Sequence, residues 1–201
     1  MANELKLKAG SKISSDTILY EGFQKHEEHI IANVGIDKID DVFQHFIAMH
    51  DEPLFFILEL PAKVDDEEEV TPGVLKTQHK DVYYMDGCTQ EEALTILMRV
   101  GNLLYNDGLS SFGFGGHESN DEIMFGKYNV LTLYSTNIGK YDDFFEPHEI
   151  EETEEIVTAW DTISEKTPGI SERYESEGKT VYDIPEMFAD WGIYLAEQRE
   201  E

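Results

Sequence analysis

The chain has little positive charge and almost no cysteine. It contains 15 Lys and Arg residues against 43 Asp and Glu residues, so its formal net charge is -28. A surface this negative repels phosphate backbones and anionic lipid headgroups, and we therefore expect neither nucleic-acid binding nor membrane binding. The single cysteine, Cys88, excludes a disulfide within the chain and any metal site built from cysteines alone.

The sequence also lacks targeting and cofactor motifs. No apolar run is long enough to cross a bilayer, and the lysines near the amino terminus are not followed by the apolar stretch of a secretory signal. The glycines of residues 112–116 lack the lysine and threonine of a phosphate-binding loop. We therefore expect a cytoplasmic protein without a cofactor.

The apolar content indicates a folded chain, although a strongly acidic composition is also typical of disorder. The 201 residues are 40% hydrophobic and 11% aromatic, which is enough for one domain with a real core. We expect a single domain over residues 1–201. Residues 1–12 and 62–73 are expected to be mobile, because the first stretch has few apolar contacts and the second contains a like-charge block.

The pattern of apolar residues predicts an α+β fold. Residues 109–135 hold three β-prone runs separated by two turns, which is typical of a β-meander. We predict a mixed, mainly antiparallel sheet with this meander, about 109–135, at its centre and three to four amphipathic helices packed on it. Helical spacing predicts these helices over residues 36–49, 89–105, 148–165 and 184–198.

Shorter runs complete the prediction. Residues 54–60 form a nearly continuous apolar run, which predicts a central strand. Further strands are predicted at residues 17–20, 29–34 and 81–85, and residues 21–28 are polar enough for a connection. Thr89 and Glu92 have the spacing of a capping box at the start of the second helix.

The turn of the meander is a candidate cation site. It gathers an imidazole and three carboxylates, the ligands that hard and borderline cations prefer. The acids do not have the alternating spacing of an EF-hand. The other interpretation is a glycine-rich connection whose polar side chains bond to the local backbone. The four candidate metal ligands are His117, Glu118, Asp121 and Glu122.

Two acidic clusters are candidate partner-binding surfaces. Aromatic residues lie close to the second cluster, and aromatic anchors within a charged rim are typical of tight protein interfaces. The other interpretation is that the acids form solvated faces and the aromatic residues belong to the core. The candidate partner-binding residues are Asp65, Asp66, Glu67, Glu68, Glu69, Glu149, Glu151, Glu152, Glu155, Tyr141 and Phe144.

Three stretches together carry a resemblance to a class of known proteins. They are His50-Asp51-Glu52-Pro53 with the strand at 54–60, the segment 112–121, and the acidic residues after Pro147. In these the chain resembles the small, acidic, single-domain α+β immunity proteins that bacteria encode beside polymorphic toxins. The resemblance implies inhibition by binding, in which an acidic face covers the active site of a basic toxin, often a nuclease.

The sequence leads to one main hypothesis and two alternatives. The main one is a non-enzymatic cytoplasmic protein whose acidic surface binds and neutralises a basic protein partner, with a toxin as one candidate. The first alternative is an enzyme or regulatory domain that binds a metal or small ligand near His117 and Glu118. The second is a structural or regulatory domain that forms a homodimer through an apolar patch.

Overall fold

Large and small residues alternate along strand β8 (Ser111–Gly116), and this alternation gives the sheet two different faces. Phe112 and Phe114 are buried in the hydrophobic core. Successive side chains of a strand point to opposite faces, so Ser111, Gly113 and Gly115 lie on the other face. One face of the strand is therefore bulky and apolar, and the other carries almost no side chain.

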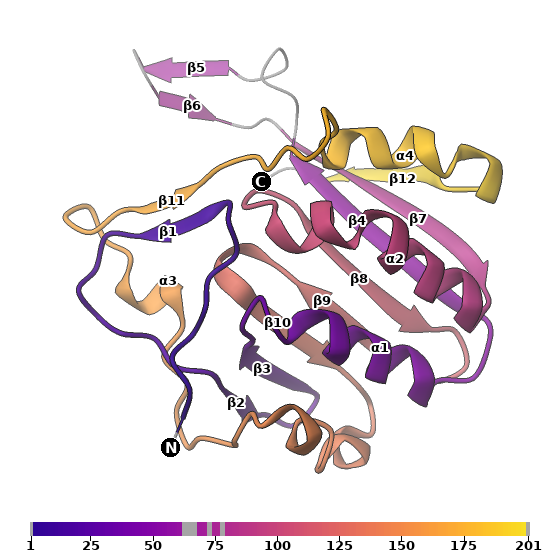
Figure 1. Cartoon of the computed structure of the whole chain (residues 1–201), viewed down its shortest axis with the longest axis horizontal. Helices are drawn as coiled ribbons and strands as arrows, with labels where there is room; N and C mark the ends of the chain where they lie inside the picture. Colours follow the sequence, from indigo (N-terminus) through magenta and orange to yellow (C-terminus); the bar gives the residue numbers. More distant parts are fainter. Residues whose placement is uncertain (1, 62–67, 72–73, 77–78, 200–201) are drawn as a thin grey trace.

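The computed structural model describes residues 2–61, 68–71, 74–76 and 79–199, and Figure 1 shows the arrangement of their elements. Within these residues, eight strands form one antiparallel sheet. In spatial order they are β12 (Tyr194–Arg199), β7 (Lys80–Cys88), β4 (Leu54–Pro61), β8, β9 (Glu122–Phe125), β10 (Val130–Tyr134), β3 (His29–Asn33) and β2 (Gly22–Lys25).

The order of the strands confirms the predicted α+β class and its central meander. Strands β8, β9 and β10 follow one another both in the chain and in the sheet. The apolar run predicted at 54–60 is β4, which lies between β7 and β8 and is buried along its core face. Strands β3 and β7 likewise occupy the positions predicted at 29–34 and 81–85.

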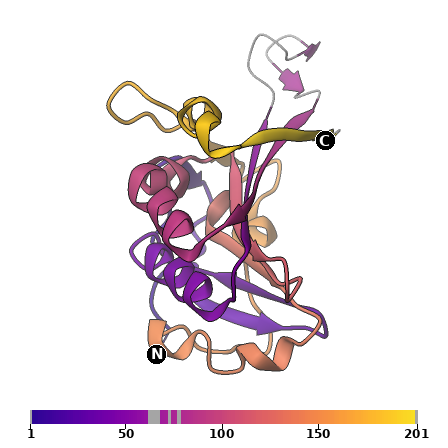
Figure 2. The ribbon, with the colours of Figure 1, turned by 90° about the vertical axis from the view of Figure 1, so that its right-hand side faces the viewer.

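Two long helices cover one face of the sheet, as Figure 2 shows from the side. Helix α1 (Ile39–Met49) buries five apolar residues at helical spacing, and helix α2 (Gln90–Asn106) buries seven residues. The predicted capping box of Thr89 and Glu92 is confirmed at the start of α2. The ring of Phe43 stacks on that of Phe112 with centroids 4.7 Å apart, so helix and sheet share one core.

Smaller elements frame this sheet. Strand β1 (Ser11–Ile13) pairs with β11 (Gly169–Ser171), and β5 (Glu68–Thr71) pairs with β6 (Val74–Lys76). Of the segment 62–73, expected to be mobile, residues 62–67 and 72–73 lie outside the described residues. In the segment 1–12, also expected to be mobile, Leu5 and Lys8 are buried, and the Lys8 ammonium donates to the Gly126 carbonyl at 2.8 Å.

The helix predicted at 148–165 is wrong. The chain instead forms a 3-10 turn, η4 (Glu146–His148), an extended stretch, and one helical turn, α3 (Ala159–Thr162). The reason lies in the edge strand β2, whose Phe23 amide donates to Glu151 and whose Phe23 carbonyl accepts from Thr153. This pairing satisfies backbone groups of the edge strand β2. They would stay exposed to solvent if the paired segment formed a helix.

The helix predicted at 184–198 is also wrong beyond its first turns. It consists of α4 (Ile184–Met187) and the turn η6 (Ala189–Trp191), and Gly192 then takes a left-handed conformation with φ +87°. After this glycine the chain extends as β12 along β7. Residues 21–28 include strand β2 as well as a turn, and the strand predicted at 17–20 is reduced to a bridge at Tyr20.

Among the described residues, no helix combines the length and the apolar character that crossing a membrane requires.

Candidate functional site

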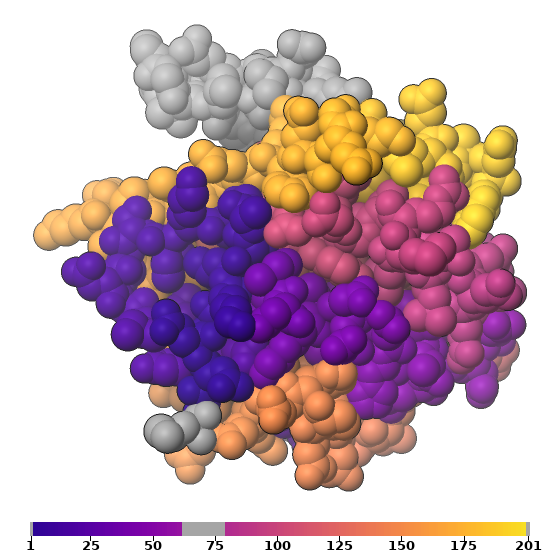
Figure 3. Space-filling model, in the orientation of Figure 1, coloured from indigo at the N-terminus to yellow at the C-terminus, as the bar shows by residue number. Residues whose placement is uncertain are grey.

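An acidic ridge lies on the segment that follows β10. Six carboxylate residues of this segment line one hollow of about 620 Å³, together with Asn3, Phe23 and Ile150. In the space-filling view this segment, coloured orange, forms the lower margin of the molecule next to α1 (Figure 3). The ridge consists of Asp142, Asp143, Glu146, Glu149, Glu151 and Glu152.

The negative charge of the acidic ridge is poorly compensated within the described part of the chain. Asp142 pairs with Lys25 at 2.5 Å, and the other five carboxylates form no ion pair there. The Lys38 ammonium pairs with Glu21 at 2.7 Å and also donates to the backbone carbonyl of Glu149 at 3.4 Å. Carboxylates gathered in this way repel one another, and a cationic partner would relieve the repulsion.

An apolar groove adjoins the acidic ridge. It has a volume of about 420 Å³ and runs beside residues 153–157, directly after the acids of the ridge. Its exposed apolar side chains are Ile18, Tyr20 and Val157, with 54%, 50% and 49% of their surfaces accessible. Glu155 also lines this groove. An apolar centre with a charged rim is the usual composition of a protein interface.

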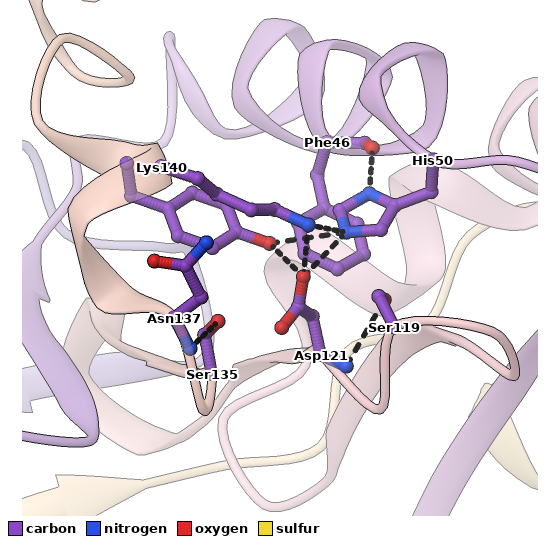
Figure 4. A network of polar contacts seen from close by, with 8 residues as sticks. Phe46, His50, Ser119, Asp121, Ser135, Asn137 and Lys140 are labelled. Atoms are coloured by element: carbon purple, nitrogen blue, oxygen red, sulfur yellow. Dashed lines mark hydrogen bonds and ion pairs between the residues drawn. The ribbon is translucent and has the colours of Figure 1, made fainter.

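A buried polar network holds the start of the acidic ridge in place (Figure 4). His50, at the end of α1, directs Nδ1 at the Phe46 carbonyl 2.6 Å away and Nε2 at Asp121, 3.1 Å away. The Tyr141 hydroxyl donates to the same Asp121 oxygen at 2.9 Å, and the Lys140 ammonium also reaches it. Lys140 and Tyr141 immediately precede the first two acids of the ridge.

Asp121 is the centre of this network. Burial alone would raise the pKa of its carboxyl, but hydrogen bonds from Lys140, Ser135, His50 and Tyr141 outweigh it and lower the pKa to about 2. His50, Asp121 and Tyr141 are all buried, whereas the Lys140 side chain is 30% exposed. The network therefore holds the start of the ridge in place.

A pair of histidines ties the middle of the ridge to α1. His45 Nδ1 and His148 Nε2 lie 3.0 Å apart, and the His45 ring also stacks on Phe144 with centroids 4.6 Å apart. Burial lowers the pKa of both imidazoles, and the charge of His45 lowers that of His148 further. The contact between the two histidines and the stacking of His45 on Phe144 are therefore most favourable when the imidazole rings are neutral.

This histidine pair predicts a loss of stability on acidification. In the unfolded chain, both imidazoles take up protons as the pH falls through about 6.5. In the folded chain, their lowered pKa values delay uptake, so the unfolded state binds more protons and is favoured. Urea unfolding at pH values of about 7.5 and about 5.5 should show the wild type losing stability relative to a His45→Gln/His148→Gln variant. An equal change in both proteins would contradict the prediction.

The structure separates the four residues of the predicted cation site. His117 is exposed and lies 3.4 Å from Asp86, and Glu118 is exposed beside it. Asp121 points into the core towards His50, whereas Glu122, the next residue, lies on the open face of the sheet. The expected convergence is wrong because neighbouring residues of an extended chain point to opposite sides. Among the described residues, no group of three or more His, Cys, Asp or Glu side chains is placed to hold a metal ion.

The predicted partner-binding residues lie in different environments. Glu149, Glu151, Glu152 and Glu155 are exposed along the acidic ridge and the apolar groove. Tyr141 and Phe144 are wrong as surface anchors, because their rings are buried against Phe46 and Phe145. Of the first acidic cluster, Asp65, Asp66 and Glu67 lie outside the described residues, and Glu68 and Glu69 belong to strand β5.

The exposed apolar residues of the groove were missed from the sequence. Ile18 and Tyr20 belong to a short predicted strand and Val157 to a predicted helix, and none of the three was among the candidate partner-binding residues. The segments 17–20 and 153–157 come together because each lies next to β2. Only this long-range pairing brings the two segments to one surface.

Comparison of this chain with protein-family models, with curated proteins and with solved structures finds no match. Its function is therefore inferred from the geometry of its own residues.

Proposed function

We propose that this chain is a non-enzymatic cytoplasmic protein that binds and neutralises a basic protein partner. The observation that supports it best is the arrangement of the acidic ridge, with six carboxylates around one hollow, directly beside an exposed apolar groove. The acids attract a cationic surface over a distance and orient it. The groove supplies the apolar contact that holds the complex once it has formed.

The two parts of this surface have different tasks in the complex. Interactions between exposed charges weaken as salt shortens the Debye length, so the ridge mainly sets the rate of association. Burial of Ile18, Tyr20 and Val157 depends little on salt and mainly sets the rate of dissociation. The resemblance to bacterial immunity proteins suggests a toxin as the partner, and inhibition then requires only that the partner's active site be covered.

The test is co-purification from the host at two salt concentrations. A tagged chain should retain a basic protein at about 0.1 M salt and release much of it at about 1 M, where the Debye length falls from about 10 Å to about 3 Å. The retained protein should lose its activity when the chain is added back in equal amount. Retention of no basic protein at low salt, or of one that stays fully active, would contradict the proposal.

A further inference from the structure

A second hollow, of about 540 Å³, lies on the face of the sheet opposite α1 and α2. Met124 of β9 and Thr132 of β10 line it and face each other in the register of the two strands. Each alternates along its strand with residues of the hydrophobic core, so the hollow and the core lie on opposite faces. Its volume is typical of a small-molecule site, for which the range is about 300–1,000 Å³. We call this feature the sheet hollow.

A cluster of ion pairs forms one side of the sheet hollow. Glu59 pairs with Lys80 at 3.3 Å and with Arg199 at 2.8 Å. Arg199 pairs with Glu197 as well, at 2.5 Å. The four side chains carry two charges of each sign, and these charges are engaged with one another. The cluster therefore attracts neither an anion nor a cation strongly.

Glu122 and Lys127 are the other two charged residues of the sheet hollow. Within the part of the chain that the structure describes, neither side chain forms a hydrogen bond or an ion pair. Burial raises the pKa of the Glu122 carboxyl, the charge of Glu59 adds to the rise, and Arg199 opposes it. Glu122 begins β9 and Lys127 follows its end, so about 13 Å of extended chain separates them. The hollow thus presents one acceptor and one donor, well apart.

Two exposed aromatic rings line the sheet hollow, one near each of these groups. Tyr134 is 49% exposed and lies directly opposite Glu122 in the register of β10 and β9. Trp160 is 52% exposed and meets the ring of Tyr128, the residue after Lys127, edge to face with centroids 4.9 Å apart. Exposed rings are flat apolar surfaces, and a ligand with flat apolar faces can stack on both of them.

These features together determine which kind of ligand fits. The two free groups have opposite charges, so a ligand with a net charge of either sign meets a like charge in the hollow. A free amino acid is neutral overall, but its ammonium and carboxylate lie too close together to reach both ends. A chain of pyranose sugars with equatorial hydroxyls fits better. Its hydroxyls donate and accept hydrogen bonds along the whole chain, and its axial C–H groups give each ring a flat apolar face.

We propose that the sheet hollow binds a neutral oligosaccharide of β-linked pyranose rings, which stacks on Tyr134 and Trp160 and forms hydrogen bonds with Glu122 and Lys127. The inference does not rest on the proposed function, because the sheet hollow shares no lining residue with the acidic ridge or the apolar groove. The chain can therefore hold an oligosaccharide and a basic partner at the same time.

Tryptophan fluorescence tests the inference directly. The chain has two tryptophans, and Trp160 lines the sheet hollow whereas Trp191 packs on Phe188 elsewhere. In a Trp191→Phe background, the probes are cellohexaose, xylohexaose and N-acetylchitohexaose, which are neutral hexamers of β-linked pyranose rings. At least one of them should change the emission of Trp160 in a saturable way. No saturable change with any of the three hexamers would overturn the inference.

The exposed ring of Tyr134 allows a matched pair of variants. Tyr134→Ala should weaken binding of the hexamer by about tenfold, the size expected for the loss of one stacking ring. The control is Tyr20→Ala, because Tyr20 is 50% exposed but lies in the apolar groove. This control should leave the affinity unchanged. Equal affinities of the two variants would mean that the sugar does not stack in the sheet hollow, and the inference would be lost.

Glu122 provides a second, polar test. Glu122→Ala should also weaken binding by about tenfold, because the sugar loses a hydrogen bond to a charged acceptor. Glu118→Ala, at an exposed position of the turn before β9, should have no effect. An unchanged affinity in Glu122→Ala would contradict the inference. Failure of the proposed function looks different, since saturable sugar binding without retention of a basic protein from the host would support the sheet hollow and contradict the proposed function. Retention of a basic protein without sugar binding would do the reverse.

Discussion

Replacing Asp121 with alanine is expected to lower the free energy of unfolding by about 3–5 kcal/mol, the range for removing one member of a buried charged pair. The Asp121 carboxylate accepts hydrogen bonds from Tyr141 and Lys140 and faces His50. Without this carboxylate, the three polar groups lose their common acceptor, and those of His50 and Tyr141 stay buried. Urea unfolding followed by circular dichroism would measure the loss.

Lys140 provides the control for this prediction. Its side chain is 30% exposed, so its ammonium can be hydrated when Asp121 is absent, and Lys140→Met alone is expected to cost less than Asp121→Ala. The double variant should be more stable than the sum of the two losses predicts, because both changes break the same contact. A loss below about 1 kcal/mol for Asp121→Ala would show that the network is not needed for folding.

Reversing three charges of the acidic ridge is expected to weaken binding of the basic partner that we propose by about 100-fold or more, since each opposed pair becomes a like-charge pair. The variant is Glu149→Lys/Glu151→Lys/Glu152→Lys. All three side chains are exposed, so the fold should be unchanged. Titration calorimetry with the co-purified partner at about 0.1 M salt would measure the change in affinity.

The matched control makes the same three charge reversals at positions outside the ridge. Glu175→Lys/Glu186→Lys/Asp190→Lys changes the net charge by the same amount, at exposed positions outside the ridge. It should weaken binding by less than about threefold, because only the general attraction between the two proteins is reduced. Equal losses in the two variants would mean that total charge, and not the ridge, governs binding.

Local sequence patterns were sufficient to predict the elements that pack on the hydrophobic core and whose ends carry a recognisable signal, such as a helix cap. The spacing of Val42, Phe43 and Phe46 predicted α1, and Thr89 with Glu92 predicted the start of α2. The alternation of phenylalanine and glycine in β8 was visible in the sequence as well. The β-prone runs of residues 109–135 predicted this strand and the meander, but they did not reveal that the side chains of Phe55 and Met124 cover the glycines of β8.

The elements that were missed are those whose conformation is set by a distant edge of the sheet. Residues 149–157 are rich in acids that suit the start of a helix, yet Phe23 of β2 holds them extended. The same holds for the site. His50 meets Asp121 from 71 positions away and Tyr141 from 91 positions away, and no spacing rule connects residues so far apart.

The stretch that carries the acids also shields the rim of β2. Phe23 offers its backbone groups to Glu151 and Thr153, and Gln24 adds side-chain bonds to the same stretch at Glu154 and Ile156. An uncovered strand rim is a template on which other chains assemble. Conditions that detach the stretch, such as charging of His45 and His148, would thus disrupt the acidic ridge and expose the strand rim to self-association in a single event.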